Sequence, residues 1–595
     1  MTFTTRPTLT GTFGMVSSTH WLASQAAMRM LELGGNAFDA AAAGGLVLQV
    51  VEPHLNGPGG DLPAIVATAQ DPTPVVLCGQ GPAPAGATTE HFRSLGLDTV
   101  PGSGPLAAVV PGAFDAWLLL LRDHGTLELA DVAAPAIHYA RHGHPFLASA
   151  RATVERVREL FESDWTTSAE LWLPGGAPPE AGSLFRNPTW AATLERLVAE
   201  GQAAGATREV RIEGTRRAWA EGFVAEAVDR FARRPFRHSG GEVLPGVITG
   251  ADLASYRAHW EPAVTAEWHG HTVAKTGPWG QGPTLLQVLG LLDALAADCP
   301  EVLDPGSLAG AHATVEAWKL VMADREAWFG DSAEVPVADL LDPGYLAGRA
   351  ALVGERADIT VRPGRPGGRE PRLAALALRT ATDAVDPGAG EPTVRRDGAT
   401  RGDTCHIDVV DRWGNIVAAT PSGGWLQSSP TIPELGFALG SRLQMTWLEP
   451  GLASSLVPGR RPRTTLSPTL VLRDGEPVLA CGTPGGDQQD QWQSLFLLRH
   501  VVGGAAIQEA IDAPMFHTTS FPGSFWPRLV EPGVVVAEDR LGAEVLDGLR
   551  ARGHRVVAQG PWSLGRMCAV ARDPRTGLLS AGANPRGMQG YAVGR

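Results

Sequence analysis

A sharp change of pattern at Thr404 constrains this chain more than any other feature of its 595 residues. From Arg356 to Arg401 the sequence is rich in Gly, Pro and Arg and has little periodicity. Directly afterwards, in RGDTCHIDVVDRWGNIVAAT, apolar residues predict a hairpin that turns at residues 413–415. A patternless segment of this length is uncommon inside a compact protein unless it has a function or is disordered. The border between Asp403 and Thr404 is therefore a candidate functional position.

A threonine at the start of a strand can serve as a nucleophile if the chain is cut just before it. Its hydroxyl is a weak acid, so catalysis requires a base within hydrogen-bond reach. A free α-amine on the same residue supplies that base, with an unperturbed pKa of about 8. The hypothesis is that the Thr404 hydroxyl attacks the Asp403 carbonyl, the acyl group moves from nitrogen to oxygen, and water releases the ester. The pattern alone also fits a threonine that only fills a pleated surface.

Nearby residues allow other interpretations. Cys405 would be the nucleophile if the chain were cut between residues 404 and 405. His406 is predicted to be a hydrogen-bonding strand residue in preference to a catalytic base. The stretch from Asp487 to Asp490 follows a Gly-rich turn, and it either contacts the substrate or only begins a helix.

Composition excludes several classes of function. The formal net charge of −14 argues against general binding of nucleic acid, which needs a concentrated basic surface. Five widely spaced cysteines without a C-x-x-C pair suggest neither a disulfide framework nor a zinc site. The motifs HExxH, GxxxxGK(S/T) and GxSxG are absent. No window has the apolar run of a membrane helix, and the first residues lack the features of a secretory signal, so we expect a cytoplasmic enzyme.

The N-terminal part predicts two helices and a strand. Leu22, Ala26, Met30 and Leu33 recur at helical spacing before a Gly-Gly pair. Asn36 can cap a second helix over about residues 37–51, which is apolar nearly all round and should be buried. A Gly-rich turn over residues 56–60 and a strand over 62–67 follow.

The rest of the chain alternates between helical and strand patterns. Residues 106–350 are mostly helical in pattern. A second hairpin is predicted over residues 469–472 and 478–481, with its turn at Asp474-Gly475. The Gly-rich segment 482–486 then leads into a helix over about residues 488–501.

Seven segments, in order along the chain, resemble the γ-glutamyltransferase family of N-terminal nucleophile hydrolases. RGDTCHIDVVDRWGNIVAAT is similar to the family's T-x-H-x-x-V-x-D strand followed by G-N, with Thr404 in first position. The other six segments are ASQAAMRMLELGGNAFDAAAA with VVEPHLNGPGG, PLAAVVPGAFDAW, ADVAAPAIHYARHGHP, ITGADLASYRAHW, RPRTTLSPTLVLRDG and GTPGGDQ. One short match would be weak evidence, but seven in the same order are specific.

The resemblance implies an α+β fold, a four-layer αββα sandwich. It also implies a proenzyme that cuts itself into a large chain, residues 1–403, with a flexible segment at about 356–403, and a small catalytic chain, residues 404–595. The two chains would associate into one unit, and a homodimer of the pair is left open. No metal or organic cofactor is implied. The expected partners are a small acyl or amide substrate and water or an amine as acceptor, with no nucleic acid and no membrane.

Catalytic roles can be carried over from the family by position. Asp403 and Thr404 would flank the cleaved bond, and Thr404 would be the nucleophile. Gly485 and Gly486 would present backbone N–H groups to the oxyanion, which suits their place before a helix. Ser422 stands where the family has a second Thr that supports the nucleophile.

The substrate pocket departs from the family pattern. Thr464 and Thr465 take the place of a Ser pair that lines the pocket, and Gln444 matches the family. Gln80, however, stands where γ-glutamyl enzymes hold the substrate carboxylate with an Arg, a role suited to bidentate pairing.

Two partners of the substrate amine also differ from the family. They are replaced by Gly424 and Trp447. Trp425, Trp492 and Trp526 also lie in or after the pocket segments, where they either favour a more apolar acyl group or are ordinary core residues.

These features predict a self-processing threonine amidohydrolase or acyltransferase whose substrate is not a standard γ-glutamyl amide. Family branches that act on oxamate, on β-lactam side-chain amides, or on a C–C bond beside a keto acid suggest the range of substrates. A genuine γ-glutamyltransferase or glutathione hydrolase is one alternative. A non-enzymatic scaffold that stays uncleaved is another.

Overall fold

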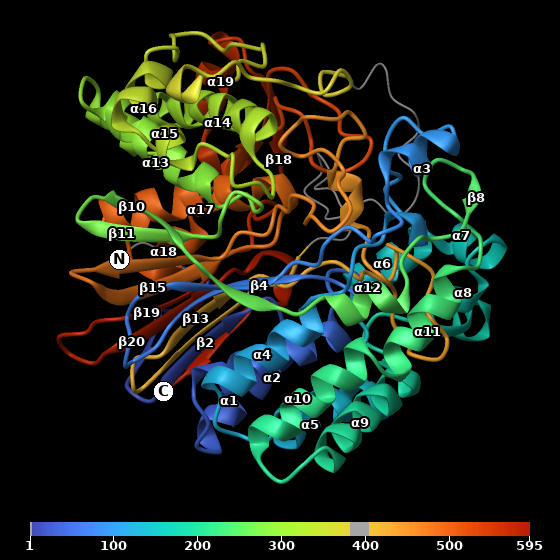
Figure 1. Cartoon of the computed structure of the whole chain (residues 1–595). Coiled ribbons are helices and arrows are strands. Elements are labelled where there is room, and N and C mark those ends of the chain that lie inside the picture. Colours follow the sequence, from blue (N-terminus) through green and yellow to red (C-terminus); the bar gives the residue numbers. More distant parts are fainter. Residues whose placement is uncertain (1–2, 381–403) are drawn as a thin grey trace.

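The computed structural model describes residues 3–380 and 404–595, which fold around two stacked seven-stranded sheets (Figure 1). Neighbouring strands within each of these sheets are antiparallel. The nucleophile sheet, named for its strand next to Thr404, has the order β21 (Tyr591–Gly594), β2 (Gly14–Ser18), β12 (Ile407–Asp411), β13 (Ile416–Ala419), β3 (Leu62–Ala67), β4 (Val75–Gly79) and β9 (His259–Pro262). The second sheet has the order β1 (Leu9–Gly11), β20 (Leu579–Ala583), β19 (Cys568–Arg572), β15 (Glu476–Gly482), β14 (Thr469–Arg473), β11 (His271–Lys275) and β10 (Val264–Trp268).

Each sheet combines strands from both sides of residue 404. In the nucleophile sheet, β12 pairs with β2 and with β13, and β13 pairs with β3. In the second sheet, β14 pairs with β11, and β20 pairs with β1. The segments before and after the predicted cleavage point therefore share one core, so they would remain together after a cut.

An apolar layer lies between the two sheets. Val410 of β12 faces this layer, whereas Ile407 and Val409 face the helices on the opposite side of the sheet. Leu470 of β14 and Ala480 of β15 reach the same layer from the second sheet. This alternation follows from the two-residue period of a strand, and it buries both faces of β12.

Helices cover the outer face of the nucleophile sheet. The main ones are α1 (Trp21–Glu32), α2 (Ala37–Val51), α4 (Ala113–His124), α5 (Leu129–His142), α9 (Pro188–Ala203) and α10 (Arg208–Ala220). All residues of α2 are buried, as its apolar composition predicts, and it contacts β12 and β13. The predicted cap is confirmed, because Asn36 and Asp39 form a reciprocal capping box at its start.

A second helical layer covers the other sheet, at the upper left of Figure 1. Its helices are α13 (Pro283–Ala296), α14 (Leu308–Trp328), α16 (Pro343–Ala350), α17 (Gln489–Leu497), α18 (Ile507–Asp512) and α19 (Ala543–Ala551). A three-stranded sheet, β16 (Phe516–Thr518), β17 (Val534–Glu538) and β18 (Arg555–Gln559), packs with them. The order helix, sheet, sheet, helix confirms the predicted four-layer α+β fold.

The remaining elements are short. They are the helices α3 (Thr89–Ser94), α6 (Ala148–Arg156), α7 (Arg158–Ser163), α8 (Thr166–Trp172), α11 (Phe223–Ala232), α12 (Gly250–Ser255) and α15 (Val337–Leu340), and the strand pairs β5 (His144–Pro145) with β6 (Leu184–Phe185) and β7 (Phe236–Arg237) with β8 (Val243–Leu244). Both predicted hairpins are confirmed as β12–β13 and β14–β15. Among the residues placed by the structure, no helix combines the length and apolar character that a membrane crossing requires.

The predicted flexible segment is only partly described. Residues 356–380 are irregular apart from a short 3-10 turn, Pro366–Gly368. Within them, Ala374 and Ala377 are buried in one cluster with Trp447. Residues 381–403, including the predicted cleavage residue Asp403, lie outside the described residues, so the division of the chain at 403/404 stays a prediction.

Candidate active site

Thr404 lies just before β12 and is almost completely buried. It forms an isolated antiparallel bridge with Ser422, which follows β13. The Thr404 hydroxyl donates to the Ser422 hydroxyl across 3.3 Å. The hairpin register therefore places the predicted supporting hydroxyl beside the predicted nucleophile.

Gln489 is a second neighbour of the Thr404 hydroxyl. Its Nε2 atom donates to Thr404 Oγ1 across 3.4 Å, and its Oε1 atom accepts from the backbone N–H of Ser467 at 3.2 Å. Gln489 begins α17 and is fully buried. The sequence left open whether this segment contacts the site, and the structure places one of its side chains directly against Thr404.

The pair Gly485-Gly486 forms the turn before α17. Both residues have positive φ, at +139° and +52°. A Cβ on Gly485 would come within 2.3 Å of the Trp492 ring, and one on Gly486 within 3.1 Å of Phe525. Only glycine avoids both the left-handed strain and the close contacts here. The turn leads into the helix start where an oxyanion is favoured.

A buried ion pair anchors the start of α17. The Asp490 carboxylate lies 3.0 Å from Lys275 Nζ and accepts a 2.6 Å hydrogen bond from the Ser467 hydroxyl. Burial raises the pKa of Asp490, an effect that Lys275 opposes, and burial lowers the pKa of Lys275. Breaking such a pair would leave an uncompensated buried charge, so the pair holds α17 against β11 and β14.

His406 is held between two partners in the layer between the sheets. Nδ1 lies 2.9 Å from Thr420 Oγ1, and Nε2 lies 2.8 Å from Asp408 Oδ1. Burial raises the pKa of Asp408 to about 6, with the neighbouring His406 opposing that rise. Because both ring nitrogens are engaged, this geometry supports a strand hydrogen-bonding role for His406 in preference to a catalytic base.

The Cys405 side chain contacts a different network from that of Thr404. Its thiol lies 3.1 Å from Glu52 Oε2, which also accepts a 2.6 Å hydrogen bond from Thr19. Burial raises the pKa of Glu52, and its hydrogen bonds oppose that rise. The Cys405 thiol is therefore hydrogen-bonded to a carboxylate at the end of α2. This contact disfavours Cys405 as the nucleophile.

The predicted pocket residues are buried but differ in how they are held. Gln444 is locked, because Nε2 donates to the Gly102 carbonyl at 3.0 Å and Oε1 accepts from the Trp526 N–H at 2.9 Å. Gln80 directly follows β4, and neither of its amide atoms has a hydrogen-bond partner among the described residues. A neutral amide therefore occupies the position where the family resemblance expects an arginine.

The other predicted pocket residues lie around the loops that approach Thr404. Thr464 donates its N–H to the Trp279 carbonyl at 2.9 Å, whereas Thr465 Oγ1 is buried without a partner in the described part of the chain. Trp425 donates its indole N–H to the Leu55 carbonyl at 2.8 Å and packs with Phe525. An aromatic surface therefore adjoins the Gly486 turn.

Trp447 belongs to a cluster of buried charges that the sequence did not predict. Its indole N–H donates to Glu326 Oε1 at 2.6 Å, and the Arg528 guanidinium lies 3.5 Å from its ring centroid. Arg325 and Arg463 also contact Glu326. The one available signal was Arg463 itself, a charged residue in the pocket segment RPRTT.

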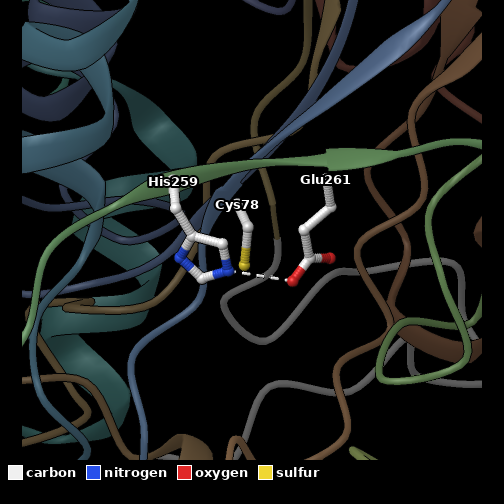
Figure 2. Close-up of side chains that lie close together, drawn as sticks. All are labelled: Cys78, His259 and Glu261. Carbon is white, nitrogen blue, oxygen red and sulfur yellow. Dashed lines mark hydrogen bonds and ion pairs between the residues drawn. The ribbon is translucent and has the colours of Figure 1, made fainter. Parts of the chain in front are cut away.

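Two groups among the described residues have three ligand-type atoms close enough to hold a metal ion. In the first, His259 and Glu261 project from β9 toward Cys78 (Figure 2). Arg461 Nη1 lies 3.0 Å from Cys78 Sγ and also pairs with Glu261. Because a guanidinium already supplies the positive charge, this group needs no metal ion.

The second group contains His312, Glu316 and His554. Lys319 pairs with Glu316, and the two imidazole rings contact each other at 2.8 Å. Burial lowers the pKa of His554 to about 3. Here too a cation of the chain neutralises the carboxylate, so the group has no evident need of a metal.

Comparisons with known proteins agree with this arrangement. The sequence profile of the family described as Gamma-glutamyltranspeptidase matches residues 23–594. The chain is 30% identical to the glutathione hydrolase-like YwrD proenzyme of Bacillus subtilis (strain 168), over 98% of this chain and 99% of that protein. It is also 30% identical to the oxamate amidohydrolase proenzyme of Klebsiella pneumoniae, over 98% of each.

A solved structure described as "Structure of LmbA2991HD" is 59% identical and superposes with a TM-score of 0.94 over all of both chains. The match to the family profile spans nearly the whole chain, and the relatives named above are proenzymes. The chain therefore belongs to the gamma-glutamyltranspeptidase family, as a self-processing amidohydrolase.

Proposed function

We propose that Thr404 is the nucleophile of an acyl-transfer enzyme that hydrolyses a small amide other than a standard γ-glutamyl amide. The observation that carries this proposal is the site of Thr404, where Ser422 and Gln489 contact one hydroxyl at 3.3 and 3.4 Å. Neither neighbour is a base. A base must therefore come from elsewhere, and the α-amine released by cleavage at 403/404 supplies it on the same residue.

The proposed reaction proceeds in two steps. Thr404 Oγ1 attacks the substrate carbonyl carbon while the α-amine takes the hydroxyl proton. The C–N bond then breaks, the amine leaves with that proton, and an ester remains on Thr404. Water attacks the ester, giving its proton to the α-amine, and releases the acid with the Thr404 hydroxyl restored. The N–H groups of Gly485 and Gly486 would stabilise the oxyanion in both steps.

The choice of substrate rests on the pocket. Gln80, Gly424 and Trp447 replace the groups that would hold a γ-glutamyl carboxylate and amine in the family pattern. An amide cannot replace the bidentate charge of arginine toward a carboxylate at that position. The Klebsiella relative is described as acting on oxamate, so oxamate is the first small amide to test.

The experiment compares wild type with Thr404→Ala and Thr404→Ser. Wild type should give two fragments on denaturing electrophoresis, the smaller beginning TCHIDVV, whereas Thr404→Ala should stay intact and lose about a thousandfold or more of any amidase activity. Thr404→Ser keeps a hydroxyl and should still cleave itself, more slowly. An uncut wild-type chain with full activity would contradict the proposal, and an uncut chain without activity would favour a scaffold.

A genuine glutathione hydrolase is the second candidate, because the Bacillus relative is described as glutathione hydrolase-like. Release of p-nitroaniline from γ-glutamyl-p-nitroanilide separates the two candidates. Turnover of this anilide above that of oxamate and simple acyl anilides would favour the second candidate. No turnover by a fully cleaved enzyme would favour the altered pocket.

A further inference from the structure

A small recess lies in the helical layer that covers the nucleophile sheet. Its volume is about 30 Å³, and its lining includes Gln49 of α2, Asn56 of the turn after α2, and Trp190 of α9. Trp190 belongs to the apolar cluster on this side of the sheet. The Thr404 hydroxyl instead receives a hydrogen bond from Gln489 of α17, which lies in the other helical layer. The recess and the Thr404 hydroxyl are therefore contacted by different layers of the fold.

Three buried side chains of the recess have unused hydrogen-bonding atoms. Among the described residues, no partner reaches either amide atom of Gln49, either amide atom of Asn56, or Nε1 of Trp190. Gln49 is 4% exposed, Trp190 2% and Asn56 0%. A buried polar atom without a hydrogen bond is costly, so atoms of this kind are normally satisfied by a ligand or by water.

The recess adjoins an open groove of about 540 Å³. Four residues line both spaces, namely Phe185, Asn187, Thr431 and Gly436. The groove has largely apolar walls, which include the half-exposed Leu184 and four prolines. The groove therefore connects the recess to solvent along an apolar surface.

The polar groups shared by the groove and the recess are already satisfied. Trp172 Nε1 donates to Thr431 Oγ1 at 3.2 Å, and Asn187 Nδ2 donates to the Gly436 carbonyl at 2.8 Å. The unused hydrogen-bonding capacity therefore lies deeper, on Gln49, Asn56 and Trp190.

The size and charge of the recess limit what it can hold. A volume of about 10–15 Å³ is enough for one water molecule, so 30 Å³ fits two small polar atoms and is too small for a ring. None of the residues that line the recess is charged. A carboxylate would only accept hydrogen bonds and an ammonium group would only donate them, whereas a carboxamide does both. The two unpartnered side-chain amides need a group of that last kind.

We infer that the recess binds the carboxamide group of a small neutral amide whose apolar body lies in the groove. Gln49 and Asn56 would each donate to and accept from such a ligand, and the Trp190 indole would donate to it. The apolar body would be buried against the groove walls. This inference goes beyond the proposed function, because it assigns a second binding site at which no bond is broken.

This second site adjoins the loop that carries Ser422. Asn56 forms a parallel bridge with Gly423, and Gly424 lines the recess. Gln427, farther along the same loop, donates from Nε2 to the His54 carbonyl at 3.1 Å. A bound amide would therefore contact the loop that places Ser422 beside Thr404.

The test measures binding by saturation-transfer NMR, which does not depend on turnover. The probes are hexanamide, N,N-dimethylhexanamide, hexanoate and hexylamine. Hexanamide should bind wild type with a Kd of about 1 mM. The other three should bind about tenfold more weakly, because each lacks either the donor or the acceptor.

Variants of the recess locate the binding. Gln49→Met and Asn56→Leu should each weaken hexanamide by about fivefold or more, because each removes a donor and an acceptor. Gln202→Met removes an exposed amide of α9 and should bind hexanamide like wild type. Thr404→Ala should also bind it like wild type.

The outcomes decide the inference in either direction. No binding, or equal affinity of wild type for all four probes, would mean that the recess holds water only and would overturn the amide site. Unchanged affinity in both Gln49→Met and Asn56→Leu would also overturn it, as would loss of binding in Thr404→Ala. If Asn56→Leu does not fold, Gln49→Met and the comparison of hexanamide with its dimethyl analogue decide. Failure of self-cleavage or turnover would overturn the proposed function and leave these measurements unaffected.

Discussion

The site of Thr404 and the arginine cluster of Arg325, Arg463 and Arg528 differ in the kind of side chain that they bring together. Thr404 contacts neutral groups, the Ser422 hydroxyl and the Gln489 amide, and lies in a bridge set by the hairpin. The cluster instead concentrates charge, with Arg463 only partly satisfied. Under the proposed function, the neutral surrounding would leave activation of the Thr404 hydroxyl to its own α-amine. The comparison shows that the neutral and the charged surroundings meet at one segment, because Gln489 contacts Thr404 and Asp487, two residues earlier, pairs with Arg325.

The prediction with the largest expected effect compares how much Arg325 and Arg463 contribute to the free energy of unfolding. Arg325→Met removes a guanidinium that bonds Asp487, Gln281 and Pro522, so it should lower the free energy of unfolding by about 3–5 kcal/mol. Arg463→Met breaks one ion pair and should cost clearly less. Urea denaturation followed by circular dichroism measures both. Equal losses would mean that Arg463 is a structural arginine like Arg325.

The second effect concerns the predicted oxyanion turn. Gly485→Ala forces a Cβ against Trp492 at positive φ, so it should reduce kcat by about a hundredfold to a thousandfold. The matched control is Gly475→Ala in the β14–β15 turn. Gly475 also has positive φ, +79°, but nothing lies near its Cβ position, so only stability should fall, by about 1 kcal/mol. Steady-state kinetics on the best substrate measures kcat for both variants. Equal kcat values for Gly485→Ala and Gly475→Ala would exclude a catalytic role for the Gly485-Gly486 turn.

The third effect is a pH dependence of stability that arises in β12, the strand that follows Thr404. Asp408 has a pKa raised from 3.8 to about 6, so the folded protein holds its proton more tightly than the unfolded chain. The contribution of Asp408 to stability should therefore be largest below about pH 4, fall between pH 4 and 6 by about 3 kcal/mol, and then level off.

Asp408→Asn is the matched variant for this prediction. It is neutral at every pH and should lack this fall. The difference in unfolding free energy between the two proteins, measured from pH 4 to 7, checks the prediction. A constant difference across that range would show that Asp408 is ionised throughout.

The smallest effect concerns the Gln489 amide beside Thr404. Gln489→Leu removes the donor to Thr404 Oγ1, so kcat should fall by about tenfold, with self-cleavage slowed to a similar degree. Gln493→Leu is a comparison within the same helix, since Gln493 bonds Ser467 and Thr469 and not Thr404. If kcat falls equally in both variants, Gln489 contributes by stabilising the position of α17 and not through its hydrogen bond to Thr404.

Much of the fold was predictable from local pattern. The turn at residues 413–415, the cap at Asn36 and the apolar helix 37–51 each combine residue types that act over a few positions, and the structure contains all three. The position of Thr404 before β12 follows from the same alternation. The full burial of α2 was also predictable, because a helix that is apolar all round has no face for solvent.

The arginine cluster was not predictable in this way. Arg325, Arg463 and Arg528 are more than sixty residues apart along the chain and come from α14 and two loops. Their common partner, Glu326, has no local pattern that identifies it. The contact between Gln489 and Thr404 spans 85 positions and was left open for the same reason.

The sequence by itself determined the strand that begins after Thr404, the hairpins, the helix caps and the family, because these depend on residue order over short spans. Only the tertiary structure decided that the Gln489 amide contacts Thr404 beside the predicted Ser422 hydroxyl, and which of the three buried arginines has the fewest partners. Those contacts depend on how two sheets and two helical layers bring distant loops together. Whether a buried charge is compensated is a property of that three-dimensional neighbourhood, and residue order alone does not contain it.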